Sequence, residues 1–287
     1  MTNPFPVPAI YSGLGEIAES YDVILCDVWG VLHDGRSAHS RAIEALQRFR
    51  GLRGPVILLS NAPRPAKDLR AQFERLAVPE DCYDAILTSG MLAREDLACR
   101  SAARELKILH LGPERDRGIF ESLPVVCVEA GQAELVLCTG LFDDDHETPD
   151  DYRDVLRDAE GRGLEFLCAN PDILVQRGGA LVYCAGALAR LYETLGGRSV
   201  YYGKPYAPIY AAALEIAGKK HKRPQCLAIG DGLETDIRGA NAAGIDAVFI
   251  ADGVHGENIP EVTSGIIASL CAEAGVTARG AMRALVW

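Results

Sequence analysis

Short apolar runs rich in branched side chains alternate along the chain with stretches in which apolar residues recur at helical spacing. After the first run, Ile43, Leu46 and Phe49 predict one apolar face of a helix near Ser40–Arg50, and a second helix is predicted around Ala66–Leu76. Near-continuous apolar strands that alternate with helices are typical of a mostly parallel sheet with helices on both faces, so the pattern predicts the α/β class. The predicted strands are Asp22–Asp27, Pro55–Ser60, Ala85–Thr88, Leu106–Leu111, Val125–Val128, Leu135–Thr139, Glu165–Cys168, Val200–Tyr202, Cys226–Ile229 and Ala247–Ile250.

The middle of the chain repeats this alternation on a smaller scale. Residues 89–198 are long enough, and hold enough apolar runs, for a separate α/β unit. We therefore expect a discontinuous core domain built from residues 1–88 and 199–287 and an inserted domain built from residues 89–198. No low-complexity linker marks the two junctions.

An acidic stretch inside the predicted insert, Asp143–Asp151, admits two interpretations. A calcium-binding loop would need a glycine at its sixth position, and this stretch lacks one. The alternative is the start of a helix, in which Thr148 is the cap, Pro149 is the first helical residue and Asp150 and Asp151 lie at the positive end of the helix dipole. The helix start fits the sequence better.

Composition narrows the class of function. Apolar residues make up 48% of the chain and charged residues 24%, which is ordinary for a globular protein, and no apolar run reaches the ~20 residues of a membrane span. The formal net charge of −11 argues against a nucleic-acid surface, because such surfaces are basic. The first residues show no basic start followed by an apolar segment, so we expect no secretory signal and a cytoplasmic location.

Four of the apolar runs lead into residues that can do chemistry. In an open parallel sheet, ligands bind beyond the carboxyl ends of the strands, so residues at several strand ends can form one site. Each of these residues alone is also a common turn or capping residue, but together they predict a functional site. They are Asp27, Ser60 with Asn61, Lys204, and Asp231 with Asp236 five residues further on.

This set of side chains suits phosphoryl transfer. An aspartate carboxylate can attack phosphorus and form an aspartyl-phosphate, which divides one difficult step into two. Because two anions repel each other, the site needs a cation, and Mg²⁺ prefers one or two carboxylates such as Asp27 and Asp231 together with waters and a phosphate oxygen. The Ser60 hydroxyl and the Lys204 ammonium would then bind the phosphoryl oxygens.

With these motifs the sequence resembles the haloacid dehalogenase (HAD) superfamily of phosphohydrolases, and it is most similar in wording to the type IIA members, the NagD-like and nitrophenylphosphatase-like sugar phosphatases. The segments that carry the resemblance are DVWGV at 27–31, LSN at 59–61, GKP at 203–205 and GDGLETD at 230–236, with further likeness in VWGVLHDG at 28–35, ANPD at 169–172 and DGVHGENIP at 252–260. The resemblance implies a Rossmann-like core domain and an α/β cap domain inserted between Ser60 and Lys204.

The resemblance also implies which residues bind the metal. Asp27 would be the nucleophile and the first metal ligand, the backbone carbonyl of Trp29 the second and Asp231 the third. Asp236 would lie in the outer shell of the metal or hold Lys204 in place. The implied cofactor is Mg²⁺.

Phosphate and substrate contacts follow from the same resemblance. Ser60 and Lys204 would act in catalysis by binding the phosphoryl group, and the cap would supply substrate contacts. The predicted phosphate- and substrate-binding residues are Trp29, Gly30, Ser60, Asn61, Lys204, Asn170 and Asp172, with the glycine-rich segment Arg177, Gly178 and Gly179 as a further candidate.

One position departs from the family pattern. The resemblance implies a second aspartate two residues after the nucleophile, where it protonates the leaving group and later activates water. Here that residue is Trp29, whose side chain offers only an N–H donor. Three accounts are open: His33, Asp34 or a cap residue moves the proton, the substrate has a good leaving group, or the protein binds a phosphorylated ligand and barely turns it over.

The sequence therefore predicts a Mg²⁺-dependent phosphohydrolase that acts on a small phosphorylated metabolite, such as a sugar phosphate, through an aspartyl-phosphate. The alternative is a phospholigand-binding or regulatory protein on the same fold. We expect neither a nucleic-acid nor a membrane partner, and the resemblance is compatible with a homodimer formed through the cap.

Overall fold

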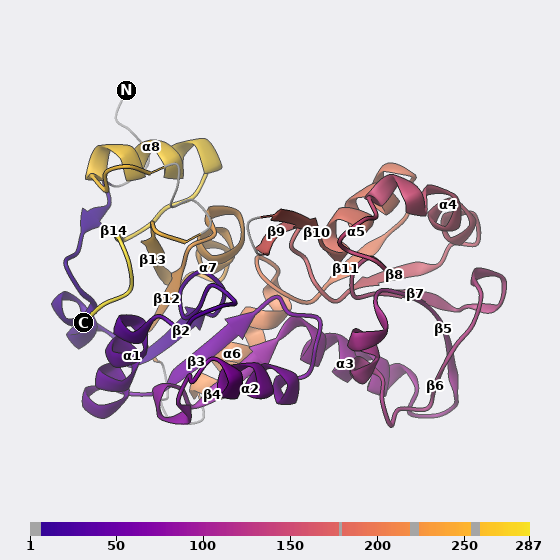
Figure 1. Cartoon of the computed structure of the whole chain (residues 1–287), viewed down its shortest axis with the longest axis horizontal. Coiled ribbons are helices and arrows are strands. Elements are labelled where there is room, and N and C mark those ends of the chain that lie inside the picture. The colour runs from indigo at the N-terminus through magenta and orange to yellow at the C-terminus, as the bar shows by residue number, and fades with distance from the viewer. Residues whose placement is uncertain (1–6, 178–179, 219–223, 254–258) are drawn as a thin grey trace. The chain divides into compact units, whose positions relative to one another are not determined.

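The computed structural model describes residues 7–177, 180–218, 224–253 and 259–287 (Figure 1). The chain forms two compact units. The first consists of Met1–Ser60, Arg70–Leu87 and Ile209–Trp287, and the second of Asn61–Leu69 and Thr88–Pro208. Among the described residues, no helix has both the length and the apolar character needed to cross a membrane.

The first unit is built around a seven-stranded sheet in the order β1-β14-β13-β12-β2-β3-β4. The pairings that join β1 through to β3 are all parallel. Every residue of β2, β3 and β12 is buried, as expected for strands covered on both faces. The strands are β1 (Ala9–Ile10), β2 (Val23–Asp27), β3 (Val56–Ser60), β4 (Ala85–Thr88), β12 (Cys226–Gly230), β13 (Asp246–Ile250) and β14 (Gly280–Met282).

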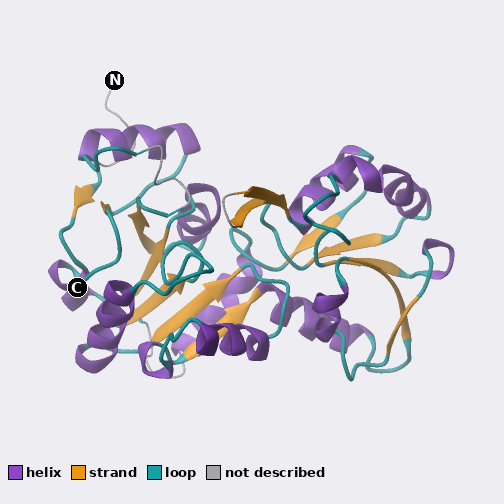
Figure 2. Cartoon of the chain, in the orientation of Figure 1, coloured by secondary structure: helices purple, strands orange, loops and turns teal. Residues whose placement is uncertain are grey.

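Helices follow the strands of this sheet in alternation (Figure 2). Leu46 and Phe49, two of the three residues that predicted the first helix, are buried in α1. The predicted α/β class, a mostly parallel sheet with helices on both faces, is confirmed. The helices are α1 (Ser40–Leu52), α2 (Ala66–Arg75), α6 (Ala207–Gly218), α7 (Arg238–Ala242) and α8 (Ser264–Ala274), with the short turns η1 (Leu14–Glu16), η2 (Ala18–Ser20), η3 (Glu80–Cys82) and η7 (Leu233–Ile237).

The second unit has a five-stranded sheet in the order β11-β8-β7-β5-β6, with all four pairings parallel. A separate antiparallel pair consists of β9 and β10. The strands are β5 (Leu106–Leu111), β6 (Val125–Cys127), β7 (Leu135–Cys138), β8 (Glu165–Cys168), β9 (Leu174–Arg177), β10 (Ala180–Tyr183) and β11 (Ser199–Tyr201). The helices are α3 (Ser89–Arg100), α4 (Arg153–Gly161) and α5 (Ala185–Thr194), with the turns η4 (Glu114–Ile119), η5 (Ala130–Gln132) and η6 (Pro149–Tyr152).

Both faces of this smaller sheet are covered. Along β7, Leu135 and Leu137 belong to the hydrophobic core that contains Leu97 of α3, whereas Val136 and Cys138 belong to the core formed with α4 and α5. Side chains alternate between the two faces of a strand, so one apolar run serves two cores. This is why the run reads as continuously apolar in the sequence.

The structure differs from the sequence prediction at β11. This strand was predicted to belong to the core sheet, but it pairs with β8 in the five-stranded sheet, where Tyr201 lies opposite Cys168. The residues up to Pro208 therefore group with the second unit, past the predicted boundary at residue 198. Apolar character alone does not say which sheet a three-residue strand joins, because both sheets bury their strands.

The acidic stretch in the second unit begins a helical turn, as predicted. Thr148 and Asp151 form a capping box, in which each side chain pairs with the backbone of the other residue, and Pro149 occupies the first helical position. The turn η6 runs directly into α4.

Candidate active site

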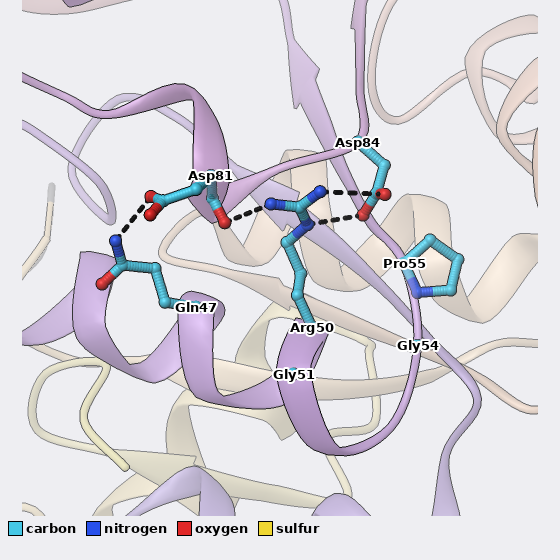
Figure 3. A pocket seen from close by; sticks show the side chains of 7 residues that line it. All are labelled: Gln47, Arg50, Gly51, Gly54, Pro55, Asp81 and Asp84. Atoms are coloured by element: carbon cyan, nitrogen blue, oxygen red, sulfur yellow. Dashed lines mark hydrogen bonds and ion pairs between the residues drawn. The ribbon is translucent and has the colours of Figure 1, made fainter.

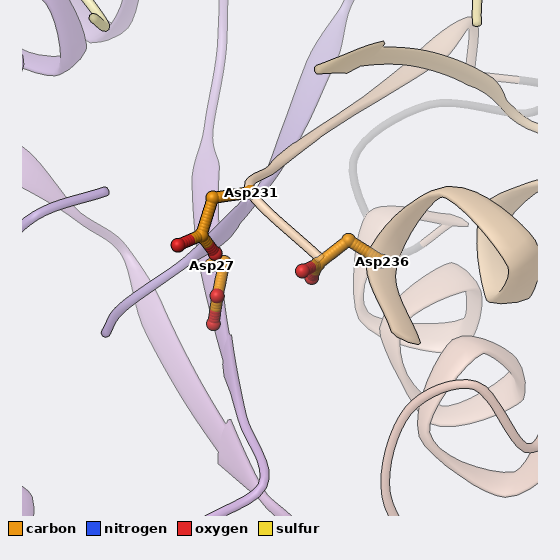
Figure 4. Close-up of side chains that lie close together, drawn as sticks. All are labelled: Asp27, Asp231 and Asp236. Atoms are coloured by element: carbon orange, nitrogen blue, oxygen red, sulfur yellow. The ribbon is translucent and has the colours of Figure 1, made fainter. Parts of the chain in front are cut away.

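Three buried carboxylates meet at one edge of the seven-stranded sheet. Asp27 is the last residue of β2, Asp231 follows β12 directly, and Asp236 lies in η7. One carboxylate oxygen from each lies within 4.8 Å of the others, and Figure 4 shows Asp236 directed toward the other two. Because β2 and β12 are parallel neighbours, their carboxyl ends share one edge, and this brings the first two carboxylates together.

Local hydrogen bonds hold these carboxylates in place. Oδ1 of Asp27 accepts a hydrogen bond from the backbone N–H of Val28 at 2.7 Å. Oδ2 of Asp236 accepts one from the backbone N–H of Gly232 at 3.0 Å, and the Tyr210 hydroxyl donates to the backbone carbonyl of Asp236 at 3.1 Å. The residues of η7 form a π-helical turn shortly after β12, and Asp236 lies in this turn. Such turns are frequent at functional sites.

Two glycines leave the space that Asp231 needs. A Cβ atom at Gly30 would lie 2.0 Å from Oδ2 of Asp231, and a Cβ atom at Gly253 would lie 1.9 Å from the same oxygen. Gly30 also has a φ of 84°, which disfavours any other residue. Its backbone N–H donates to the carbonyl of His33 at 2.8 Å. The predicted role of Gly30 in phosphate binding stays a prediction.

The cluster of Asp27, Asp231 and Asp236 fits a divalent cation. Three buried carboxylates at this separation repel one another and are costly to keep charged without a compensating positive charge. Carboxylate oxygens are the ligands that hard divalent cations such as Mg²⁺ and Ca²⁺ prefer.

Ser60 is the last residue of β3, the strand next to β2. Asp27 lies opposite Leu59 in the register, so Ser60 extends one residue beyond Asp27 along the same edge of the sheet. Ser60 is buried. The first unit thus places Ser60 at the same sheet edge as the carboxylate cluster, which includes the predicted nucleophile Asp27.

Trp29 is packed by its own loop. Its ring lies edge-to-face against the His33 ring at a centroid distance of 5.4 Å, and His33 in turn lies edge-to-face against Phe73 at 6.0 Å. A Cβ atom at Gly35 would lie 2.3 Å from the Trp29 ring, so the backbone of Gly35 is in direct contact with the indole. The indole is therefore held by neighbours on more than one side.

His33 does not suit the role of substitute acid. It is buried, and burial lowers its pKa to about 4. Its Nδ1 accepts a hydrogen bond from the backbone N–H of Gly35 at 3.1 Å, which puts the proton on Nε2. Nε2 is buried and has no hydrogen-bond partner among the described residues. A neutral, enclosed imidazole of this kind supports Trp29 structurally.

Asp34 does not suit that role either. Its Oδ1 accepts hydrogen bonds from the backbone N–H groups of Ser37 and Arg36, at 2.7 and 2.8 Å. These bonds, with the Ser37 N–H first, lower the pKa of Asp34 below its ordinary value. The carboxylate therefore stays ionised at neutral pH and closes a turn.

The remaining predicted residues gather in the second unit. Lys204 follows β11, and its backbone pairs with the side chain of Asn61, which also bonds Asp172. Oδ1 of Asn170 accepts from the backbone N–H of Asp172 at 3.2 Å. Of the glycine-rich candidate segment, Gly178 and Gly179 lie outside the described residues.

The packing roles of three residues escaped the sequence prediction, which named His33 only as a possible proton carrier. Gly253, His33 and Gly35 shape the site through close contacts, and the signal for a close contact is weak in one sequence. A glycine shortly after a strand, at the edge where carboxylates gather, is the signal that could have identified Gly253.

A pocket of about 480 Å³ lies at the opposite edge of the first sheet, beside the amino ends of β3 and β4 (Figure 3). Arg50 of α1 forms two hydrogen bonds to the Asp84 carboxylate, 2.8 Å from Nε and 3.1 Å from its terminal nitrogen, and a third to the carbonyl of Asp81. Asp84 also accepts from the backbone N–H of Val56 at 2.9 Å. These polar groups tie α1 to the loops before both strands. The lining residues are Gln47, Arg50, Gly51, Gly54, Pro55, Asp81 and Asp84.

A parallel α/β sheet that gathers buried carboxylates at its carboxyl edge is typical of enzymes that transfer phosphoryl groups with a divalent cation. Comparison with known families agrees. Residues 24–124 match the haloacid dehalogenase-like hydrolase family, and residues 201–267 match a second family described as HAD-hydrolase-like.

Individual relatives give the same result. A solved hydrolase of the haloacid dehalogenase-like family from Brucella suis is 40% identical, with a TM-score of 0.84 over 96% of this chain and 100% of that chain. The ribonucleotide monophosphatase NagD of Escherichia coli is 26% identical over 236 residues, which is 80% of this chain and 88% of the relative. A solved glycerol phosphate phosphatase from Mycobacterium tuberculosis, in complex with magnesium, is 25% identical with a TM-score of 0.65, over 83% of this chain and 70% of that chain.

The chain belongs to the haloacid dehalogenase superfamily and, within it, to the type IIA phosphatases that resemble NagD. It is a phosphoric monoester hydrolase.

Proposed function

We propose that the protein is a Mg²⁺-dependent phosphohydrolase that acts on a small phosphorylated metabolite through an aspartyl-phosphate on Asp27. The observation that carries the proposal is the cluster of Asp27, Asp231 and Asp236 at the carboxyl edge of the sheet. Two relatives support the proposal, because NagD is a ribonucleotide monophosphatase and the mycobacterial enzyme is a glycerol phosphate phosphatase.

Asp27, Asp231 and the backbone carbonyl of Trp29 would hold the cation, with Asp236 in its outer shell. The bound cation would neutralise the carboxylates and the phosphoryl oxygens, so that Asp27 can approach the phosphorus. Mg²⁺ is the expected ion because it binds carboxylate and phosphate oxygens together, and because the mycobacterial relative was solved with magnesium.

The remaining side chains bind and orient the phosphoryl group. The Ser60 hydroxyl donates to a phosphoryl oxygen, and the Lys204 ammonium supplies fixed positive charge as negative charge spreads in the transition state. The second unit acts as the cap and supplies the contacts to the rest of the substrate.

Trp29 replaces the usual general acid, and this limits the choice of leaving group. His33 is neutral and enclosed, and Asp34 stays ionised, so neither delivers a proton. We therefore expect fast turnover of phosphates whose leaving group departs as a stable anion, such as aryl phosphates. Alkyl phosphates should react more slowly, because general acid assistance is worth ~10²–10⁴ in rate.

The direct test is hydrolysis of 4-nitrophenyl phosphate at neutral pH with Mg²⁺, after removal of metal with EDTA, and in the variant Asp27→Asn. We expect turnover only in the wild-type protein with Mg²⁺. The matched control is Asp143→Asn, which changes an exposed carboxylate in another acidic cluster and should keep wild-type turnover. Equal turnover by the wild type and Asp27→Asn would refute the proposal.

The same experiment tests the alternative, a protein that binds a phosphorylated ligand without turnover. The absence of a general acid at Trp29 is the observation that favours this alternative. That alternative requires Mg²⁺-dependent binding of phosphate esters in calorimetry without turnover of any substrate. Activity that depends on Asp27 excludes it.

A further inference from the structure

Three loops of the second unit meet at the side chain of Asn61. Its Oδ1 accepts a hydrogen bond from the backbone N–H of Lys204 at 2.7 Å. Its Nδ2 donates to the backbone carbonyl of Lys204 at 3.0 Å and to Oδ1 of Asp172 at 2.8 Å. Because a backbone N–H can only donate, the contact with Lys204 fixes which end of the amide is oxygen. One buried amide thus ties the loop after β3 to the loops after β8 and β11.

The Asp172 end of this arrangement is held by its own loop. The backbone N–H of Asp172 donates to Oδ1 of Asn170 at 3.2 Å, and its carbonyl accepts from the backbone N–H of Gly186 at 3.1 Å. A Cβ atom at Gly186 would lie 2.2 Å from the carbonyl oxygen of Pro171, so the start of α5 packs directly on this loop. Asp172 therefore presents a hydrogen-bond acceptor in a fixed place.

The backbone next to Lys204 is also closely packed. A Cβ atom at Gly203 would lie 2.2 Å from Oδ1 of Asn61 and 2.9 Å from Cδ of Pro171, so only glycine allows this approach. Lys204 itself is 3% exposed. A lysine ammonium sits on a flexible stem of four carbons, and its position depends on where the backbone beneath it is held. Here both backbone polar groups of Lys204 pair with Asn61.

We propose that Asn61 is a positioning residue that sets the place of the Lys204 ammonium, and that Asp172 orients the Asn61 amide. The inference rests on the proposed function, in which Lys204 binds the phosphoryl group. Only a side chain with a donor and an acceptor meets these partners. An aspartate at position 61 would lose the donor and face the Asp172 carboxylate, and an alanine would lose both groups.

Four variants test the proposal: Asn61→Ala, Asn61→Asp, Asp172→Asn and the double variant Asn61→Asp/Asp172→Asn. For each we would measure kcat and KM for 4-nitrophenyl phosphate and the inhibition constant of inorganic phosphate. Asn61→Asp should weaken phosphate binding about 10- to 100-fold, the range for a buried polar group left without its partner. Asp172→Asn should weaken phosphate binding less than Asn61→Asp does, because the amide oxygen at position 172 can still accept from Asn61.

The double variant is the decisive one. The amide introduced at position 172 can donate to the carboxylate introduced at position 61, so roughly tenfold of the lost phosphate affinity should return. Mg²⁺ affinity measured without phosphate should stay at its wild-type value throughout, because the carboxylate cluster belongs to the first unit. A merely structural role predicts neither the rescue nor this separation.

A double variant that binds phosphate no better than Asn61→Asp would overturn the inference, as would wild-type phosphate affinity in Asn61→Asp. Should Asn61→Asp fail to fold, Asn61→Ala takes its place and must lose phosphate affinity while it keeps Mg²⁺ affinity. The variant Asp27→Asn distinguishes a failure of the proposed function from a failure of the role given to Asn61. If Asp27→Asn still turns over substrate, the proposed function is wrong; if it is inactive and the rescue is absent, only the role of Asn61 is wrong.

Discussion

Trp29 lies two residues after Asp27, with its indole against the His33 ring and the Gly35 backbone. His33 in turn is enclosed, neutral at physiological pH and packed against Phe73. The side chains of this loop therefore pack around the indole ring. Under the proposed function, Trp29 supplies no proton to the leaving group, so the identity of this single residue decides which phosphates react fast.

Restoring a carboxylate at this position tests that conclusion. In Trp29→Asp, hydrolysis of an alkyl phosphate such as glycerol 3-phosphate should rise by about tenfold or more, while hydrolysis of 4-nitrophenyl phosphate should change little. Trp29→Phe is the matched control, because it keeps a ring and adds no acid. Steady-state kinetics on both substrates gives the answer, and an equal effect of Trp29→Asp on both would contradict it.

At the scale of elements, the turn after β2 and the loop after β13 enclose Asp231 through two glycines. Gly30 has a positive φ. A Cβ atom at Gly253 would lie 1.9 Å from Oδ2 of Asp231, about as close as one at Gly30. The position of the Asp231 carboxylate, which we propose binds the metal, thus depends on two glycines that carry no side chain.

Gly30→Ala should disturb this enclosure. The added Cβ would lie 2.0 Å from Oδ2 of Asp231, and the left-handed backbone adds about 1–2 kcal/mol of strain. We expect Mg²⁺ affinity, measured by titration calorimetry, to fall about tenfold or more, since a shift of one ligand costs binding free energy. The control is Gly51→Ala in α1, where a Cβ meets nothing within 4 Å and should leave Mg²⁺ binding unchanged. Equal affinities in the two variants would contradict the role given to Gly30.

A half-buried histidine in β5, His110, should make the second unit sensitive to acid. Burial, followed by the charge of Arg117, lowers the pKa of His110 to about 4, from 6.5 in the unfolded chain. Between these values the unfolded chain binds the extra proton and the folded protein does not, so the free energy of unfolding falls as the pH falls from 6.5 toward 4. From pH 7 to pH 5 the loss should be about 2 kcal/mol.

Urea unfolding of the wild type and His110→Gln at these two pH values measures the effect. The variant should lose less stability on acidification, because it has no imidazole to protonate. The ring nitrogen Nε2 of His110 lies 3.0 Å from the Thr139 hydroxyl, a contact that the glutamine amide can replace. The same loss in both proteins would assign the acid sensitivity to other groups.

The sequence predicts most elements because buried parallel strands leave long apolar runs, as in β2, β3 and β12. It misses β1, β9, β10 and β14, which are two to four residues long. It also assigns β11 to the wrong sheet, because three apolar residues do not specify a partner strand. Asp27 and Asp231 were predictable as a pair, since each ends a buried strand.

The link between Asn61, Lys204 and Asp172 was not predictable in the same way. Its three residues come from separate loops and pair through an amide and a backbone, which leaves no spacing rule in the chain. All three residues were named from the sequence, but only the folded chain shows that the Asn61 amide forms hydrogen bonds with both Lys204 and Asp172.

At the scale of the whole molecule, the two units supply opposite charges. The first unit holds the three carboxylates, and the second holds Lys204. With a formal net charge of −11, the protein offers little general attraction for a phosphate group. Under the proposed function, catalysis therefore depends on one cation, on Lys204 and on the nucleophile Asp27.

The most direct test of the central claim is to look for the phosphoryl group on Asp27. The protein would be mixed with 4-nitrophenyl phosphate and Mg²⁺, quenched in acid within a single turnover, digested and analysed by mass spectrometry. Because the acid quench stops the reaction between its two steps, we expect to find the aspartyl-phosphate on the peptide that contains Asp27. It should be absent without Mg²⁺ and in Asp27→Asn. Turnover with no phosphoryl group on that peptide, or with the group on another residue, would contradict the account.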